Sequence, residues 1–397
     1  ENKKKIALSI GSFGYKEVNF LSNNAFKKHS LAFGGNYLVS DNDYNYLVPQ
    51  SFVNPSESIN EPLRNNEFEK LSLFVNDNIQ LDQHQLRFNL QYNKQDKALA
   101  NYQNNSPENS STLESDQIRY SIQHYWLADI NSFGDINFEG IEINYSGETK
   151  DELYLERPNE DRIKTSDYKS TKQQISIKPN INWSTLNFTP FVDISRQDFS
   201  SFSTQNGEVI QCNGISSCDV EAEQTQINFG ARIEWKSDSY PISSYILGNQ
   251  LREKNANNAL NAIDSQKDTK NTHYSTQELG INYGKGNLNT SVNFSNGIRT
   301  PTLFELFGDR GSFKGNGNLL PEEANTITLG LQYQVKQFNL SSSLYRQDLE
   351  NSIVAIFNSS GVGSYTNVGG ALLNGFELQG NISLLDNFSK FSEKPKN

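Results

Sequence analysis

The sequence predicts an all-β protein, specifically a transmembrane antiparallel β-barrel. In short runs, apolar residues occupy every second position, as at Ile327, Leu329, Leu331, Tyr333 and Val335. This is the period of a strand with one apolar and one polar face. The runs are joined alternately by very short turns and by long polar loops, an asymmetry typical of barrels that cross a membrane.

Composition supports this fold class and excludes others. Only 35% of the residues are hydrophobic and the mean hydropathy is -0.67. The chain has no helical run of the roughly 20 apolar residues that a transmembrane helix needs. Its short alternating runs also contain too few apolar residues to build a large soluble core. A barrel needs neither, because its outer face meets lipid while its inner face stays polar. The 18 Tyr and 24 Phe fit aromatic girdles, although both residues also favour strands in general.

Sixteen strands are expected in chain order. For fourteen of them the apolar positions lie within 6–12, 18–20, 31–39, 71–79, 86–92, 118–126, 136–145, 175–183, 186–194, 227–235, 279–283, 288–294, 327–335 and 338–344; the eleventh is a strand ending near 251, and the sixteenth contains Gly375 and Glu377. A change of parity between Gly140 and Ile141 predicts a β-bulge.

The same pattern predicts where the connections lie. Short turns are expected near 82, 130–134, 184–185, 236–240 and 336–337. Long polar loops are expected over about 40–66, 96–116, 147–170, 199–223, 252–271, 299–321 and 350–364. In the first of these loops, Pro49, Pro55 and Pro62 exclude a central strand.

Charge, cysteine content and motifs limit the partners, sites and activities that can be expected. The formal net charge of -11 argues against a nucleic-acid partner. Cys212 and Cys218 lie in the polar stretch CNGISSC, where we expect a disulfide in an oxidising compartment rather than a zinc site. No motif for an enzyme, a phosphate-binding loop or a cofactor is present in the sequence, so neither enzymatic activity nor a cofactor is expected.

One group of residues could bind a metal ion. Asp41 and Asp43, beside two tyrosines in a polar loop, are candidates for Ca²⁺ binding through oxygen ligands. A solvated loop tip explains the same residues. The four histidines, His29, His84, His124 and His273, are scattered through the sequence, and we expect His29 and His84 to lie at short turns.

Three linked motifs carry a resemblance to a known family. The first is Arg299, Pro301, Thr302, Leu303, Glu305, Leu306 and Phe307; the second is Gly315, Asn316, Gly317, Asn318, Leu319, Pro321 and Glu322; the third is Tyr365, Asn367, Gly369, Ala371, Gly375 and Glu377. In this order and spacing they resemble the barrel of TonB-dependent outer-membrane receptors. The second motif departs from the family pattern, because Gly317-Asn318 stands where Asn-Pro is common.

The resemblance implies a 22-stranded barrel around a plug domain. It places residues 1–397 as a partial barrel domain, with the plug before Glu1 and six more strands after Asn397. The implied function is energy-dependent uptake of a scarce, bulky nutrient, such as a ferric siderophore or cobalamin, across the outer membrane of a Gram-negative bacterium. Its partners would be the metal chelate, membrane lipid and the TonB complex, reached through the plug. No histidine lies between Arg299 and Leu319, which makes haem a less favoured ligand.

The candidate ligand-binding residues lie in the loop that holds the first two motifs: Arg299, Glu305, Asn318 and Glu322. Two interpretations of its charged members are open. They contact the ligand, or they fasten the loop to the barrel wall by charge-assisted hydrogen bonds, which we favour.

Two other functions fit part of the sequence. A self-contained sixteen-stranded diffusion porin takes the strand count literally, but does not account for the three motifs. A secreted β-rich adhesin would need strands with two polar or two buried faces, whereas one face here is consistently apolar.

Overall fold

The strands form one large antiparallel sheet. The computed structural model describes residues 2–48, 58–102, 105–212, 216–217, 219–257, 269–310, 313–357 and 363–382. The sheet has seventeen strands, of which β12 (Glu208–Val209) only extends the loop end of β11. The other sixteen pair in chain order, as the sequence predicts: β1 (Lys3–Ile10), β2 (Lys16–Phe26), β3 (His29–Ser40), β6 (Phe68–Leu81), β7 (His84–Ala98), β8 (Thr112–Phe133), β9 (Ile136–Glu156), β10 (Lys164–Trp183), β11 (Leu186–Gln205), β15 (Val220–Lys236), β16 (Ile242–Asn257), β17 (Thr269–Lys285), β18 (Leu288–Arg299), β21 (Glu322–Val335), β22 (Phe338–Glu350) and β25 (Ala371–Ile382).

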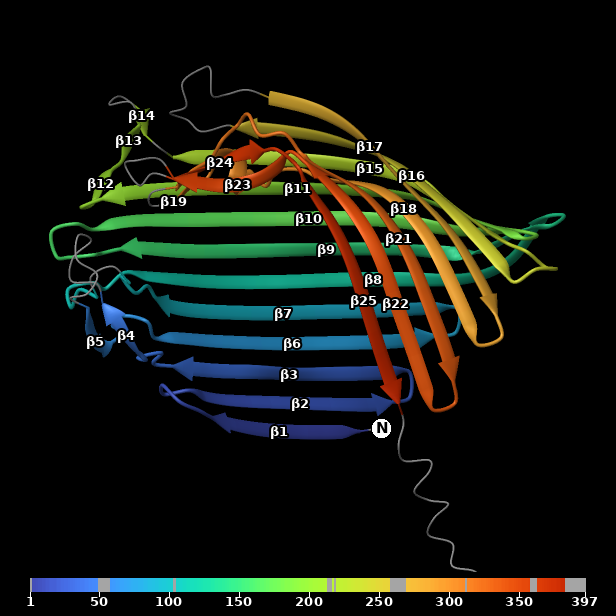
Figure 1. Cartoon of the computed structure of the whole chain (residues 1–397), viewed down its shortest axis with the longest axis horizontal. Coiled ribbons are helices and arrows are strands. Elements are labelled where there is room, and N and C mark those ends of the chain that lie inside the picture. The colour runs from blue at the N-terminus through green and yellow to red at the C-terminus, as the bar shows by residue number, and fades with distance from the viewer. Residues whose placement is uncertain are drawn as a thin grey trace, which may run out of the picture.

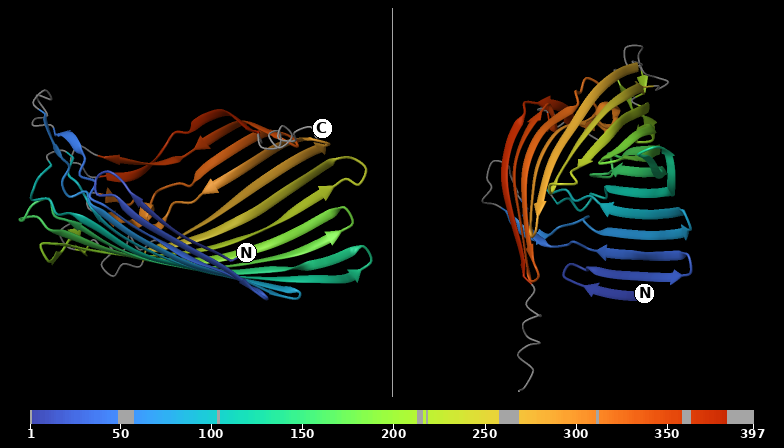
Figure 2. Two further views of the ribbon diagram at one scale, coloured as in Figure 1. Left: turned by 90° about the horizontal axis from the view of Figure 1, so that it is seen from below. Right: turned by 90° about the vertical axis from the view of Figure 1, so that its right-hand side faces the viewer.

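The sheet is curved and its two edges are free in the part of the chain that the structure describes. Figure 1 shows the strands side by side in chain order, and Figure 2 shows the sheet bent into a curved wall. Within the described residues β1 pairs only with β2, and β25 pairs only with β22. No helix in those residues is long and apolar enough to cross a membrane.

The two ends of the sheet differ in the length of their connections. At one end, which we call the short-turn end, two-residue turns join strands at 27–28, 82–83, 134–135, 184–185, 286–287 and 336–337. The first residue of several of these turns has a positive φ, for example Lys27 at 50°, Asp82 at 47° and Ser184 at 53°. At the other end, the long-loop end, most connections are longer and several contain structure of their own.

The two faces of the sheet differ in polarity. On β21, Leu329 and Leu331 are 47% and 40% exposed, and they share one face with Ile327, Tyr333 and Val335. Phe229 lies on the same face of the sheet and is also exposed. We call this apolar side the outer face, and the opposite, largely polar side the inner face. Exposed apolar side chains along a whole sheet face are what contact with lipid requires.

The aromatic residues at the short-turn end form a belt. All three tryptophans of the chain lie there on the outer face: Trp126 on β8, Trp183 at the end of β10 and Trp235 near the end of β15. Tyr283 and Tyr333 occupy equivalent positions on β17 and β21. Trp and Tyr gather at membrane–water boundaries, because their rings are apolar and their polar atoms can reach water. The belt places one edge of the membrane at the short-turn end.

The strands in the middle of the sheet extend far beyond the membrane. Strand β10 has 20 residues, yet its regular apolar alternation covers only Ile175 to Trp183. About 9–11 residues span a membrane in a barrel, so the remaining half of the strand rises toward the long-loop end. The predicted loop at 147–170 is therefore wrong in extent, because β9 continues to Glu156 and β10 begins at Lys164. Outside the membrane both faces meet water, and the alternation that marks a strand disappears.

The same correction applies to other long loops. Strand β11 continues to Gln205 and β15 begins at Val220, inside the loop expected at 199–223. Strand β16 continues to Asn257 and β17 begins at Thr269, inside the loop expected at 252–271. Residues 258–268 of that loop lie outside the described residues, as do Pro49 and Pro55.

The expected bulge is present, one residue earlier than the parity change suggested. Glu139 has no partner between Phe138 and Gly140, which pair with Ile181 and Asn180 of β10. Gly140 has a φ of 144°, and a Cβ there would lie 2.0 Å from the carbonyl oxygen of Trp126. Only glycine fits a backbone with this conformation and this close a neighbour.

Several loops at the long-loop end form small elements. The first long loop holds the hairpin β4 (Asn45–Val48) and β5 (Ile59–Pro62). The loop between β11 and β15 holds the short pair β13 (Gln211–Cys212) and β14 (Ser216–Ser217). The loops on either side of the β21–β22 hairpin contribute a helix, α1 (Leu303–Phe307), and a four-stranded sheet of β19 (Asp309–Arg310), β20 (Phe313–Lys314), β24 (Gly363–Val368) and β23 (Ser352–Phe357).

Candidate functional site

The loop between β18 and β21, residues 300–321, begins with a short capped helix. Thr302 is the N-cap of α1: its hydroxyl accepts a hydrogen bond from the Glu305 N–H at 3.2 Å. The Glu305 carboxylate in turn accepts one from the Thr302 N–H at 2.8 Å. This reciprocal pair is a capping box, which satisfies backbone donors that a helix start leaves open. Because the box holds the chain direction at Thr302, it fixes where the Glu305 side chain points.

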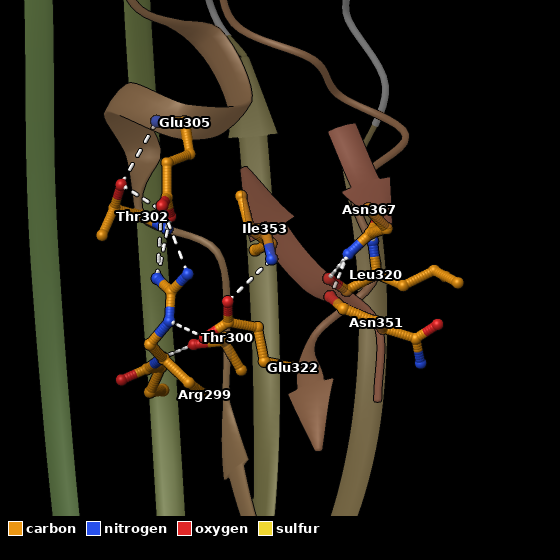
Figure 3. Close-up of polar contacts among 10 residues, drawn as sticks. Arg299, Thr300, Thr302, Glu305, Leu320, Glu322, Asn351, Ile353 and Asn367 are labelled. Atoms are coloured by element: carbon orange, nitrogen blue, oxygen red, sulfur yellow. Dashed lines mark hydrogen bonds and ion pairs between the residues drawn. The ribbon is translucent and has the colours of Figure 1, made fainter. Parts of the chain in front are cut away.

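Arg299 joins this helix to the barrel wall (Figure 3). Its Nη1 lies 3.1 Å from the Glu305 carboxylate, and its Nε donates to the Glu322 carboxylate. Arg299 is the last residue of β18, Glu322 is the first residue of β21, and the two are paired in register. The guanidinium therefore connects both ends of the loop and the first turn of α1. The fork of N–H donors in arginine suits such a bridge between two carboxylates.

The electrostatics of the bridge follow from these contacts. The outer-face alternation ends at Phe294 on β18 and Ile327 on β21, so Arg299 and Glu322 lie five residues beyond it, outside the membrane-spanning segments. The hydrogen bond from Arg299 lowers the pKa of the Glu322 carboxyl, and the N–H of Ile353 lowers it further. The hydrogen bond to Glu322 raises the pKa of Arg299 in return. Both groups are thus charged throughout the neutral range.

The bridge extends into the next loop. The second oxygen of Glu322 accepts a hydrogen bond from the backbone N–H of Ile353 on β23, at 2.7 Å. Glu322 is thus shared between Arg299 and the loop that follows β22. One carboxylate fastens two loops that are about thirty residues apart in the sequence, as the side chains in Figure 3 show.

Asn367 makes a second fastening between the same loops. Its Oδ1 accepts a hydrogen bond from the Leu320 N–H at 2.8 Å. Its Nδ2 donates to the Leu320 carbonyl at 2.9 Å and to the Asn351 carbonyl at 2.6 Å. An amide side chain that bonds both backbone groups of Leu320 substitutes for a strand partner there.

Asn316 completes the connections around α1. Its backbone N–H donates to the carbonyl of Glu305 at 2.8 Å, and its side-chain Nδ2 donates to the carbonyl of Tyr365 at 2.9 Å. Nearby, the Gly315 N–H donates to the carbonyl of Gly308 at 2.6 Å. The three sequence motifs therefore meet in space, because residues of each one bind residues of another.

Apolar packing seats α1 on the inner face of the wall. Leu303 is fully buried and Leu306 is 5% exposed. The ring of Phe304 meets three other rings edge-on, with centroids 6.2 Å from Tyr168, 6.2 Å from Phe199 and 6.3 Å from Tyr365. Leu303 also clusters with Tyr168, Phe199, Val220 and Ala222 of β10, β11 and β15. The loop therefore lies against the inner face near its long-loop end, held by packing as well as by charge.

The inner wall itself is hydrophilic and hollowed. A hollow of about 580 Å³ between β6 and β10 is lined by polar residues that include Arg119, Glu148 and Lys172. Arg119 donates to Glu148 at 2.8 Å. A neighbouring hollow of about 430 Å³ includes Lys70, and Lys150 paired with Glu152 at 3.0 Å. Such a wall suits water or a polar domain rather than a dry core.

The structure brings together three of the four predicted ligand-binding residues. Arg299, Glu305 and Glu322 form one cluster, with side chains 45%, 15% and 26% exposed. Asn318 lies apart on an exposed turn, where its N–H donates to the Asn316 side chain at 3.0 Å. Whether any of the four binds a ligand stays a prediction.

Sequence reasoning did not single out Thr302, Asn316 and Asn367 as anchors. All three stand in the motifs, and the spacing of Thr302 and Glu305 is the signature of a capping box. The roles of Asn351 and Ile353 had no sequence signal, because only their backbone atoms take part.

The other predicted sites have different outcomes. Cys218 and the side chain of Cys212 lie outside the described residues, so the disulfide stays a prediction. Near Asp41 and Asp43, the Asn42 side chain accepts from Ser40 at 3.2 Å and its carbonyl accepts from Asn66 at 3.0 Å. No group of three or more His, Cys, Asp or Glu in the described part of the chain could hold a metal ion. His29 and His84 do lie at short turns, as expected.

Comparison with known proteins agrees with this architecture. None of the curated proteins matches the sequence. Among solved structures, the chain is similar to the copper transporter OprC (TM-score 0.72, 12% identity, 96% of this chain and 59% of that one), to the FrpB iron transporter from Neisseria meningitidis (0.65, 11%, 94% and 58%) and to the ferric yersiniabactin uptake receptor FyuA from Yersinia pestis (0.62, 10%, 96% and 58%). The chain thus spans about three fifths of the length of these structures. At such identities the likeness shows the fold, a transmembrane antiparallel β-barrel.

A family model settles the membership. The model described as "TonB dependent receptor-like, beta-barrel" matches residues 12–395, nearly the whole chain. The chain belongs to the TonB-dependent receptor β-barrel family.

Proposed function

We propose that this chain is the barrel wall of an outer-membrane receptor that imports a scarce, bulky nutrient in a Gram-negative bacterium. The nutrient is a metal chelate, such as a ferric siderophore or cobalamin, and the TonB complex drives uptake through a plug domain. The family membership and the solved transporters of iron, copper and ferric siderophores support this class. Because the matched structures are longer than this chain, we also propose that the chain is part of a longer receptor.

The observation that carries the proposal is the anchored loop on the inner face. A passive pore needs only a polar lumen, whereas a receptor needs a preorganised surface at the entrance. The described residues of this loop, 300–310 and 313–321, are fastened at both ends by Arg299, at Leu320 by Asn367, and through α1 to the wall. That is the construction of a rigid binding element rather than of a mobile constriction.

Within this site we assign different roles to the predicted residues. Arg299 binds both Glu305 and Glu322, so the three residues position the loop. Asn318 stands exposed at the turn and is the member proposed to contact the ligand. Ligand binding would then depend on the first three residues through the position of the fourth.

A sixteen-stranded porin remains the second candidate, favoured by the count of long strands. A closed porin would need β1 to pair with β25, and the described residues contain no such pairing. The three sequence motifs and the family membership support the receptor over the porin.

Growth restoration tests the proposal. A strain that lacks the complete gene is grown on single sources of iron, copper or cobalamin, with and without the gene and with and without an active TonB system. TonB-dependent growth on one chelate is expected. Growth that depends on the gene but not on TonB, for small solutes of many kinds, would favour the porin.

A further inference from the structure

Two histidines face each other at the short-turn end. His84 is the first residue of β7, and His124 lies on the neighbouring strand β8. The register sets His84 opposite Trp126 and His124 opposite Leu86, so the two imidazoles are diagonal neighbours on the outer face. The Nδ1 of His84 lies 3.0 Å from the Nε2 of His124. Their rings stack, with centroids 5.2 Å apart and planes at 21°.

The spacing of the two nitrogens is that of a pair of metal ligands. Imidazole nitrogens bind Zn²⁺ at about 2.0–2.1 Å, which places two of them about 3.3 Å apart in a tetrahedral site and about 2.9 Å apart at a right angle. The observed separation of 3.0 Å lies between these values.

Little rearrangement is needed to turn both lone pairs toward one ion. Without a metal, one ring donates its N–H to the other. Moving that proton to the outer nitrogen of its own ring leaves both facing nitrogens unprotonated, with no change in total charge. A rotation about Cβ–Cγ, which is soft in histidine, then directs both lone pairs to a common point. His84 is exposed and His124 half-buried, so both rings have room to turn.

We propose that His84 and His124 form a binding site for a divalent transition-metal ion, with water completing its coordination. Neutral imidazole suits Cu²⁺, Ni²⁺ and Zn²⁺ rather than Ca²⁺ or Mg²⁺, and Cu²⁺ binds most strongly in this series. No third His, Cys, Asp or Glu joins the pair among the described residues, so the ion would keep open positions and exchange readily.

The site is separate from the proposed nutrient site. It lies on the outer face at the short-turn end, whereas the anchored loop lies on the inner face near the long-loop end. It does not depend on the proposed function, and its ion would connect β7 to β8 at the boundary of the membrane.

A nearby tryptophan reports on binding. Trp126 stacks beside His84, with ring centroids 6.4 Å apart and planes at 15°. Cu²⁺ quenches the fluorescence of an adjacent indole, so the site carries its own probe. The other two tryptophans of residues 1–397, Trp183 and Trp235, are replaced by Phe, so that Trp126 is the one left in this part of the protein.

The experiment uses the full-length protein in detergent, purified without a histidine tag. Titration with CuCl₂ should quench Trp126 saturably, and electron paramagnetic resonance of the unaltered protein should show Cu²⁺ bound by imidazole nitrogen. His84→Gln or His124→Gln should each weaken binding by at least about tenfold, because a single ligand remains. Retained heat-modifiable migration on gels shows that these variants fold.

His29→Gln and His273→Gln are the matched controls, and neither should change Cu²⁺ binding. His29 is the more stringent control, since it also lies at a short turn on the outer face, where its Nδ1 is 3.0 Å from the carboxylate of Asp77. Unchanged binding in the double variant of His84 and His124, or loss of binding in His29→Gln alone, would overturn the proposal.

Discussion

Replacing Arg299 by methionine should release the anchored loop while leaving the wall intact. The change keeps most of the side-chain length and removes the ion pairs with Glu305 and Glu322. Well-shielded hydrogen bonds to charged groups contribute about 1.5–3 kcal/mol and exposed ion pairs about 0–1 kcal/mol. The two carboxylates are 15% and 26% exposed and the guanidinium 45%, so each pair falls between these limits, near about 1 kcal/mol after screening by solvent.

The loss of about 2 kcal/mol raises the population of the detached loop roughly 30-fold. Hydrogen–deuterium exchange measures this population, because amides exchange when local structure opens. Peptides containing the N–H groups of Gly315, Asn316 and Ile353 should exchange roughly 30-fold faster in the Arg299→Met protein. Peptides from β8 should not change.

Arg119→Met is the matched control. Arg119 is also an inner-face arginine with one carboxylate partner, Glu148, but it lies on the wall away from the loop. Its replacement should leave exchange in residues 300–321 unaltered. Normal protection of that loop in Arg299→Met would refute the anchoring role, as would equal loss of protection in the Arg119 variant.

Three further predictions test the fold and the site. Leu331→Arg should block assembly, since a cation near the middle of the outer apolar band costs about 2–4 kcal/mol; heat-modifiable migration on gels checks this, with Gln332→Arg on the inner face as the tolerated control. Thr302→Ala removes the helix cap and should cost about 1 kcal/mol, which exchange of the amides in α1 would show as a roughly fivefold rise, while equal exchange would contradict the cap. Because the Glu322 pKa is lowered in the folded loop, its contribution to loop stability is complete above the ordinary value of 4.5 and is lost as the pH falls through the lowered pKa. Pepsin cleavage within 300–321 should therefore begin only below pH 4.5 in the unaltered protein and at a higher pH in Arg299→Met. The same onset pH in both proteins would argue against the linkage.

The sequence alone determined the wall of this protein. All sixteen long strands were predicted, fourteen of them from period-two alternation, because contact with lipid requires an apolar residue at every second position. The turn at 184–185 was placed to the residue, since the alternation runs to its edges on both sides. Parity also located the bulge to within one residue, at Glu139 and Gly140.

For the segments outside the membrane, only the tertiary structure decided which residues form strands. Beyond the membrane both faces of a strand meet water. The halves of β9, β10 and β11 nearer the long-loop end therefore carry no apolar alternation and were expected as loops. Their strand form comes from hydrogen bonds to neighbouring strands, which no local pattern encodes.

The site divides in the same way. The motifs named Arg299, Glu305 and Glu322 as one group, because short spacings and unlike charges are visible in a sequence. That Asn367 holds Leu320, and that Glu322 reaches the backbone of Ile353, depends on two loops separated by a whole hairpin. Likewise, the pairing of His84 with His124 arises from the register of β7 and β8. It places the Nδ1 of His84 3.0 Å from the Nε2 of His124, although the residues are 40 positions apart in the sequence.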